Sequence, residues 1–282
     1  MIRKLAGMIL VAMVVVAAGW PAEAQQFRIY TRVYNEAAAH DQPNQKKSAQ
    51  APIVHSLSLF HTGKVYDYIR EVGEVIIVEP TQRRFTILST TCELKTTVEF
   101  SELQQLVSYA RAETENYLAQ PQRQGGPPPE VAAALRFQLK PTFDRKYDEK
   151  RNVLTLQSPS LKYQARCAEF EPDVVDSYLR YADWICRLNY LLHPQSLFPE
   201  SRLALNAELR RRGVIPVEVQ LQAEIAHNVH LRAEHQIGRS LESTDLKLIH
   251  RWETLLKDPQ IKSVTFRDYQ RTVTLSGPKS RR

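Results

Sequence analysis

Residues 63–69 read GKVYDYI and residues 73–88 read GEVIIVEPTQRRFTIL, and these two stretches decide the fold. Both consist of short runs rich in β-branched and aromatic residues, and the turn residues between the runs are typical of antiparallel hairpins. The sequence therefore favours an antiparallel sheet over a doubly wound parallel one. The runs and their neighbours predict four or five consecutive strands in a meander, at residues 53–60, 64–70, 74–79, 84–89 and 94–100.

The segment EVIIVE, residues 74–79, carries apolar side chains on both of its faces. A sheet that is covered on one side alone keeps one polar face in each strand, as the sequence of residues 214–221 does. Both faces of the meander must therefore be covered. We expect the helix that follows Ser101 to cover one face, and the apolar helix around Trp184, residues 172–192, to cover the other.

The rest of the chain predicts an α+β fold, in which a curved, half-barrel-like antiparallel sheet of about ten or eleven strands carries three or four covering helices. Curvature is expected because a large sheet must protect its two edges. Residues 119–129, AQPQRQGGPPP, predict a Pro/Gly-rich linker inside a single domain that spans residues 25–282. The other expected strands are 26–34, 135–140, 153–157, 161–167, 214–221, 228–236 and one within 264–275, and the other helices are 202–212 and 244–257.

The N-terminus has the three parts of a secretory signal peptide. Arg3 and Lys4 precede an uncharged apolar run over residues 5–18, and small residues follow at Ala22 and Ala24. The alternative is a permanent membrane anchor, but a spanning helix needs about 20 apolar residues, which is more than this run provides. We therefore expect residues 1–24 to be removed and the protein to be exported, to a periplasm or to the outside of the cell.

Composition sets limits on the class of protein. The chain has 282 residues, of which 43% are hydrophobic and 24% charged, and this excludes disordered, collagen-like and multispan membrane proteins. The net charge is +7, with the basic residues spread along the chain. Because an exported protein does not meet nucleic acid, we expect no nucleic-acid partner. The charge instead indicates peripheral contact with an anionic membrane surface.

The order of the elements is similar to that of a known family. The stretch GKVYDYI (63–69), followed by GEVIIVEPTQRRFTIL (73–88) and LKTTVEFSELQQL (94–106), resembles the LolA-like and LolB-like periplasmic lipoprotein carriers. The resemblance covers roughly residues 53–118 and lies in the order of a glycine-turn hairpin, an aliphatic strand, an arginine–aromatic strand and a covering helix. It implies an open half-barrel with an apolar interior that holds acyl chains or an envelope peptide.

We expect such a ligand to lie between the meander and the helix of residues 172–192. The residues expected to contact it are Ile77, Phe85 and Ile87 on the sheet and Trp184 and Leu188 on the helix. The alternative is that the aromatic side chains of this helix, which recur at helical spacing, fill an ordinary core.

Residues for catalysis or metal binding are not indicated by the sequence. It contains no GxSxG, HExxH, P-loop or GxGxxG motif, so we expect neither an enzyme nor a cofactor. His227, His230 and His235 are close in sequence. In a strand, however, His230 points away from the other two, and those two are separated by roughly 26 Å. We therefore expect surface histidines and no metal site.

Three cysteines, Cys92, Cys167 and Cys186, have no metal-binding spacing. In an export compartment we predict a bridge between Cys92 and Cys167 and a free Cys186. The sequence leaves open the alternative that all three are thiols.

The function expected from these features is non-enzymatic binding of a lipid, a lipidated protein or an apolar peptide in a hydrophobic concavity. The alternative is an envelope sensor or scaffold with a filled core, and an exported hydrolase is the third hypothesis. Packing separates the first two, because a carrier needs a loose contact between sheet and helix and a scaffold needs a dense one.

Overall fold

The computed structural model describes residues 26–36, 51–193, 196–224 and 229–275. The predicted signal peptide, residues 1–24, lies outside the described residues, and so does His227. The described chain has the expected α+β architecture, with six α-helices and one open, mostly antiparallel sheet of twelve strands.

The strands are β1 (Phe27–Asn35), β2 (Val54–His61), β3 (Lys64–Ile69), β4 (Glu74–Glu79), β5 (Arg84–Ser89), β6 (Leu94–Glu99), β7 (Asp144–Asp148), β8 (Val153–Gln157), β9 (Leu161–Glu169), β10 (Val214–Ala223), β11 (Val229–Gly238) and β12 (Lys262–Ser263). The α-helices are α2 (Phe100–Ala119), α3 (Pro129–Leu139), α4 (Pro172–Leu192), α5 (Glu200–Arg212), α6 (Ser243–Leu255) and α7 (Phe266–Leu275).

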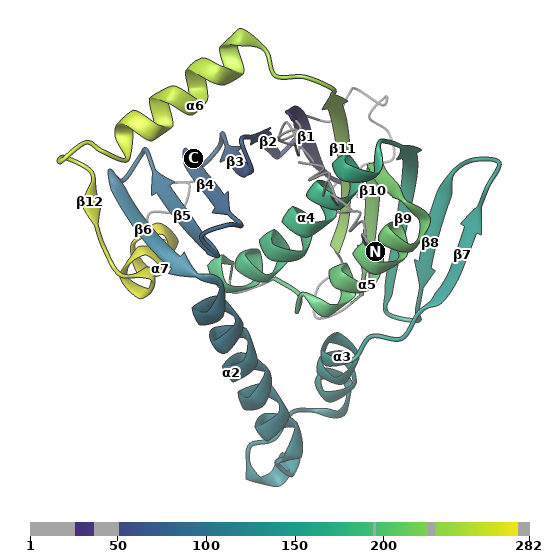
Figure 1. Cartoon of the computed structure of the whole chain (residues 1–282). Helices are drawn as coiled ribbons and strands as arrows, with labels where there is room; N and C mark the ends of the chain where they lie inside the picture. The colour runs from purple at the N-terminus through teal and green to yellow at the C-terminus, as the bar shows by residue number, and fades with distance from the viewer. Residues whose placement is uncertain (1–25, 37–50, 194–195, 225–228, 276–282) are drawn as a thin grey trace, which may run out of the picture.

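Two runs of hairpins share the sheet, whose order is β12-β6-β5-β4-β3-β2-β1-β11-β10-β9-β8-β7. The first strand, β1, joins the runs because it pairs with β2 on one side and with β11 on the other. β12 pairs with β6 in parallel, and the other pairings are antiparallel. Figure 1 shows the strands in an arc with α4 and α5 inside it and α6 outside. We call the two faces of the sheet inner and outer accordingly.

The hairpin between β2 and β3 shows how local chemistry sets the register. His61 pairs with Lys64 across a two-residue turn, and both turn residues, Thr62 and Gly63, have positive φ angles of 47° and 75°. A two-residue turn of this kind matches the twist of the strands on either side of it. Glycine takes the second position without steric cost.

β4 is buried on both faces, as its sequence predicts. Ile76 and Val78 belong to the large inner core, whereas Val75 and Ile77 belong to a second core with Ile249 and Trp252 of α6. The outer cover of the meander is therefore α6.

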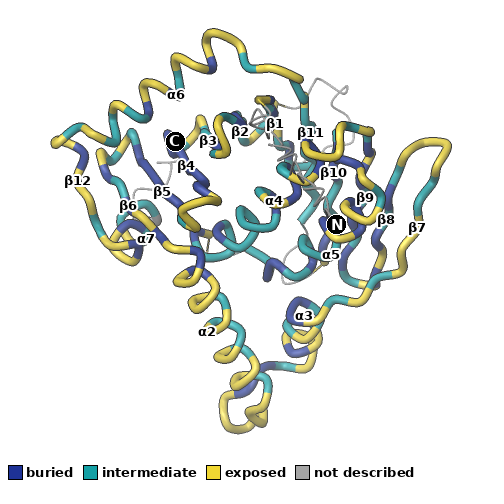
Figure 2. Tube along the Cα trace, in the orientation of Figure 1, coloured by how far each residue is buried: buried dark blue, intermediate teal, exposed yellow. Residues whose placement is uncertain are grey.

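The prediction that the helix after Ser101 covers the meander is wrong. Within that helix, α2, only Phe100 and Leu103 are buried, and Tyr109 is 67% exposed. Figure 2 shows that α2 is mostly exposed beyond its first turn, where it extends away from the sheet. Its apolar residues are too sparse to bury a long face, whereas α6 presents Trp252 and Ile249 together.

Two predicted strands are helices in the structure. Residues 135–140 lie mostly in α3, which begins with proline at its first position and continues through three alanines, Ala132–Ala134. Residues 266–275 form α7, and the capping pair Thr265 and Asp268 explains its start, because the Asp268 backbone N–H donates to Thr265 Oγ1 at 3.2 Å. These two helices account for the excess over the expected three or four.

The Pro/Gly-rich segment 119–129 connects α2 to α3 through a short 3₁₀ turn, η1 (Gln122–Gln124). Gly126 is required at this turn because a Cβ atom there would lie 1.9 Å from the carbonyl oxygen of Gln120. The segment is therefore a close-packed corner between two helices.

Candidate functional site

The five residues expected to contact a ligand lie in two different cores. Phe85, Ile87, Trp184 and Leu188 belong to the inner core or pack against it. Ile77 belongs to the outer core under α6, so its grouping with the other four is wrong. The cause is strand alternation, because the register places Ile77 opposite Thr86 and not opposite Phe85 or Ile87.

The contact between the meander and α4 is densely packed at this end. The rings of Phe100 and Trp184 stack with centroids 3.8 Å apart, and Phe85 meets Trp184 edge-on at 6.3 Å. The side chains of Phe85 and Leu188 are fully buried. This part of the inner face has the character of ordinary core.

The inner face is less completely covered over β10 and β11. Leu221, Val229 and Ile237 are apolar and pack against the inner core, but they remain partly exposed. Tyr181 and Ile185 of α4 are also only partly buried. The apolar surface that an added ligand could cover is therefore on this side of α4, away from Phe85.

A buried acid lies on the inner face of β3. The Ser58 hydroxyl donates to Asp67 Oδ1 at 2.9 Å, and the Tyr181 hydroxyl is 3.3 Å from Ser58 Oγ. Burial raises the pKa of Asp67, while hydrogen bonds from Tyr181 and Ser58 oppose that rise. This network ties β2 and β3 to α4.

A second buried acid ties α7 to the meander. The Tyr269 hydroxyl donates to Glu74 Oε2 at 2.6 Å, and Tyr269 is fully buried. Burial raises the pKa of both groups, and the hydroxyl lowers that of Glu74 in part.

An arginine of α5 bonds within its own helix and to α4, and a histidine with a buried ring nitrogen lies on β11. Arg202 of α5 donates from Nε to Asn206 Oδ1 at 3.0 Å and from Nη2 to the Tyr178 hydroxyl at 3.3 Å. On β11, His235 Nδ1 is 2.9 Å from Thr31 Oγ1, while its buried Nε2 has no hydrogen-bond partner among the described residues. Burial, and after it the positive charge of Arg202, lowers the pKa of His235 to about 4, so the ring is neutral at pH 7.

Sequence reasoning missed Arg202, although a signal for it exists. Arg202 precedes the fully buried Leu205 and Leu209 by three and seven residues, so helical periodicity places it on the buried stripe of α5. A charged residue on such a stripe indicates a polar contact inside the fold.

Among the described residues, no three His, Cys, Asp or Glu side chains form a cluster able to hold a metal ion. His230 and His235 lie on β11 at positions of opposite parity, so they point to opposite faces of the sheet.

The predicted disulfide is wrong, because Cys92, Cys167 and Cys186 are all free thiols in the structure. Cys92 lies in the turn before β6 and Cys167 lies in β9, and seven strands separate β6 from β9 in the sheet order. Burial raises the pKa of Cys167 and of Cys186 to about 11, so neither thiol is a ready nucleophile at pH 7.

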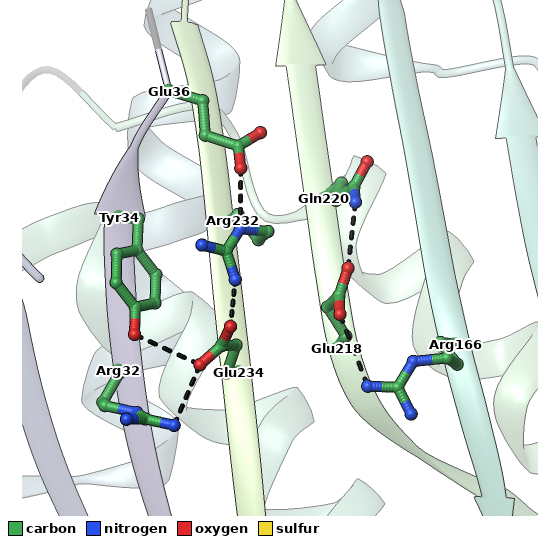
Figure 3. Close-up of polar contacts among 8 residues, drawn as sticks. All are labelled: Arg32, Tyr34, Glu36, Arg166, Glu218, Gln220, Arg232 and Glu234. Atoms are coloured by element: carbon green, nitrogen blue, oxygen red, sulfur yellow. Dashed lines mark hydrogen bonds and ion pairs between the residues drawn. The ribbon is translucent and has the colours of Figure 1, made fainter. Parts of the chain in front are cut away.

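The outer face of β1, β11, β10 and β9 carries two groups of linked polar side chains, which together we call the polar ladder. In it, Glu234 binds Arg32 at 3.0 Å and accepts from the Tyr34 hydroxyl at 3.1 Å, and it also pairs with Arg232. Figure 3 shows the ladder in front of the strands, with the helices behind them. The other members are Glu36, Arg166, Glu218 and Gln220.

An open groove of about 340 Å³ lies where the ladder strands approach the start of α6. Its lining is polar and charged as well as apolar, and Arg28 within it is paired with Glu242 at 2.6 Å and with Asp245 at 3.1 Å. The groove does not have the apolar lining expected of an acyl-chain site. Its lining residues are Arg28, Tyr30, Gln236, Ile237, Gly238, Arg239, Ser240 and Glu242.

The described helices include none that is both long and apolar enough to cross a membrane. A scan against models of protein families finds no match to the chain, and a search of curated proteins finds none either.

Proposed function

We propose that this protein is an exported, non-enzymatic binding protein that holds an apolar ligand on the inner face of a half-barrel. The ligand class is a lipid, a lipidated protein or an apolar peptide. Its compartment is a periplasm or the exterior of the cell, and its basic charge favours peripheral contact with anionic membrane surfaces. The role is that of a carrier, as the resemblance of residues 53–118 to lipoprotein carriers implies.

The observation that carries the proposal is the incomplete cover of the inner face over β10 and β11. Leu221, Val229 and Ile237 are apolar, face the helices and remain partly exposed. Covering apolar surface gains about 25 cal/mol per Å², so an acyl chain or apolar peptide would be stabilised there. The ligand therefore lies on the β11 side of α4, and Phe85, Ile87 and Leu188 serve as core.

The second candidate function, a sensor or scaffold, is favoured by the stack of Phe100 on Trp184 and by the full burial of Phe85 and Leu188. A scaffold would be captured with a protein partner, whereas a carrier would be captured with lipid or with a lipidated or apolar chain.

The test compares two neighbouring positions on β10 that point to opposite faces. Leu221→Lys places a charge on the inner face, and Gln222→Lys places the same charge on the outer face. We expect Leu221→Lys to weaken binding of the apolar dye N-phenyl-1-naphthylamine at least about tenfold, and Gln222→Lys to leave it unchanged.

Mass spectrometry of the protein purified from its own envelope gives the second measurement. Co-purified lipid, lipidated protein or apolar peptide is expected. Absence of these together with equal dye binding by both lysine variants would overturn the carrier proposal, and a stoichiometric folded protein partner would establish the scaffold in its place.

A further inference from the structure

We propose that the outward side of α6 is the surface through which this protein contacts an anionic lipid membrane. Lys247, Arg251 and Lys257 carry that contact, and we call these three residues the basic face of α6. The inference rests on the proposed function and deepens it, because it locates the peripheral membrane contact on the molecule.

The basic face follows from the helical spacing of its residues. Lys247 and Arg251 are four positions apart in α6, so they lie one turn apart on the same side of the helix. The backbone N–H of Lys257 donates to the Thr254 carbonyl at 3.0 Å, so the helical path continues to Lys257. All three residues of the basic face are exposed, whereas Trp252 points to the sheet and is buried.

The positive charges of the basic face have no ion-pair partner among the described residues. Arginines of the neighbouring strand differ, because Arg28 pairs with Asp245 at 3.1 Å and Arg32 pairs with Glu234 at 3.0 Å. The charge of the basic face is therefore free to attract an anionic partner.

The acidic residues of α6 are held by the sheet. Asp245 is 2% exposed and pairs with Arg28 of β1. Glu253 accepts from the Tyr66 hydroxyl at 2.6 Å and lies 3.5 Å from Lys64 Nζ. The helix thus separates its charges, with acids used to fix it on the sheet and cations directed to solvent.

The acids that flank α6 are also engaged. Glu242, the N-cap residue, pairs with Arg28 at 2.6 Å, and Asp258 accepts the backbone N–H of Gln260 at 2.8 Å. Beyond Asp258 the chain enters β12, where Lys262 adds a further exposed cation. The cationic character of the outward side therefore extends past the end of the helix.

The place of α6 in the fold suits a flat partner. Figure 1 shows α6 along the outer margin of the arc, and Figure 2 shows exposed residues along its outward side. A bilayer can therefore approach along the length of the helix. Lys and Arg side chains are attracted to anionic head groups without a fixed geometry, and Leu246, 43% exposed, adds apolar area that can enter the interface.

The membrane contact and the proposed ligand site lie on opposite faces of the sheet. α6 covers the outer face of the meander, whereas Leu221 and Ile237 belong to the inner face. The protein can therefore contact a membrane while its inner face is occupied, and the two sites can be tested separately.

The experiment is co-sedimentation of the protein, purified from the envelope, with vesicles of phosphatidylcholine alone or with about 30% phosphatidylglycerol. We expect at least about tenfold tighter binding to the anionic vesicles. This preference should shrink as sodium chloride rises from about 0.05 to 0.5 M, because salt screens exposed charges. Equal binding to both kinds of vesicle, or a preference that salt does not change, would overturn the inference.

A triple variant assigns the preference to the basic face. Lys247→Gln, Arg251→Gln and Lys257→Gln together should weaken binding to anionic vesicles at least about tenfold. Leu246→Ser alone should weaken it only a few-fold, since it removes apolar area and no charge.

The matched control removes the same amount of charge elsewhere. Lys140, Lys146 and Lys150 are exposed lysines in and around β7, at the opposite edge of the sheet from β12. Their combined replacement by Gln should weaken vesicle binding less than about threefold. An equal loss in both triple variants would assign the effect to net charge and would overturn the inference.

Binding of N-phenyl-1-naphthylamine separates this inference from the proposed function. The α6 triple variant should bind the dye as the wild type does, which also shows that it is folded. If the wild type binds the dye but not anionic vesicles, only the membrane surface fails; if it binds the vesicles but not the dye, the proposed ligand site fails. Absence of vesicle binding, together with a captured protein that the α6 variant alone loses, would overturn the inference in favour of an acidic protein partner.

Discussion

Two parts of the antiparallel sheet differ in their outer faces. One is the meander, β2 to β6, and the other consists of the ladder strands, β1, β11, β10 and β9. The outer face of the meander is apolar and is buried under α6, with Trp252 at 3% exposure. The outer face of the ladder strands carries the ion-paired polar ladder (Figure 3). The same antiparallel geometry thus supports a two-sided core in one half and a one-sided core in the other.

The difference shows where the stability of the sheet comes from. Burial of a large apolar side chain contributes about 1.5 to 3 kcal/mol, whereas an exposed ion pair contributes about 0 to 1 kcal/mol. The meander is therefore held mainly by burial on both faces. The ladder strands depend on their inner face for stability, and their outer side chains mainly favour one strand register.

The largest expected effect is from Ile77→Asp, which would break the two-sided core. Ile77 is 2% exposed under α6, and a charge there should lower the free energy of unfolding by more than about 4 kcal/mol. The control, Gln164→Asp on the outer face of β9, should cost less than about 0.5 kcal/mol. Urea denaturation measures both, and similar costs would show that α6 does not seal the meander.

The second-largest effect concerns the inner face of the ladder strands, where His235 should make the free energy of unfolding depend on pH. Unfolded chains protonate His235 below about pH 6.5, but in the folded protein the ring stays neutral to about pH 4. The free energy of unfolding should therefore fall as the pH drops through this window, by about 2 to 3 kcal/mol from this residue. Comparison of His235→Asn with the wild type at both ends of the window measures it, and equal pH dependence would contradict the prediction.

A smaller effect is expected where α7 meets the meander. Tyr269→Phe removes the hydroxyl that donates to the buried Glu74, so the variant should be less stable by about 1 to 3 kcal/mol. In a Glu74→Gln background the same substitution should cost less, because the group left without a donor is no longer an acid. A double-mutant cycle by urea denaturation measures the difference, and full additivity would refute the coupling.

The smallest effect is from the polar ladder. Glu234→Gln weakens contacts with Arg32 and Arg232, so we expect a cost of at most about 1 kcal/mol that shrinks as sodium chloride rises from about 0.05 to 0.5 M. Urea denaturation at the two salt concentrations checks this. A loss above about 2 kcal/mol that does not respond to salt would contradict this prediction. It would mean that the outer face of the ladder strands stabilises the fold as strongly as the outer face of the meander does.

Much of the strand pattern could be predicted from the sequence. The strands expected at residues 74–79, 84–89 and 153–157 are confirmed. They could be predicted because period-two alternation and turn residues are local signals, carried by residues only a few positions apart. The candidate site could be predicted only in part: Phe85, Ile87, Trp184 and Leu188 do share a core, but Ile77 does not. Arg202 and Tyr178 are 24 positions apart and meet only through the packing of α5 on α4.

What the sequence determined by itself is local: the strand and turn pattern of the meander, the apolar character of both faces of β4, and the long apolar helix α4. Tertiary structure alone decided which element covers each face, that Cys92 and Cys167 are far apart in the sheet order, and that β1 pairs with β11. The physical reason is that alternation and capping depend on neighbouring residues, whereas cover and pairing depend on which distant apolar surfaces fit together best.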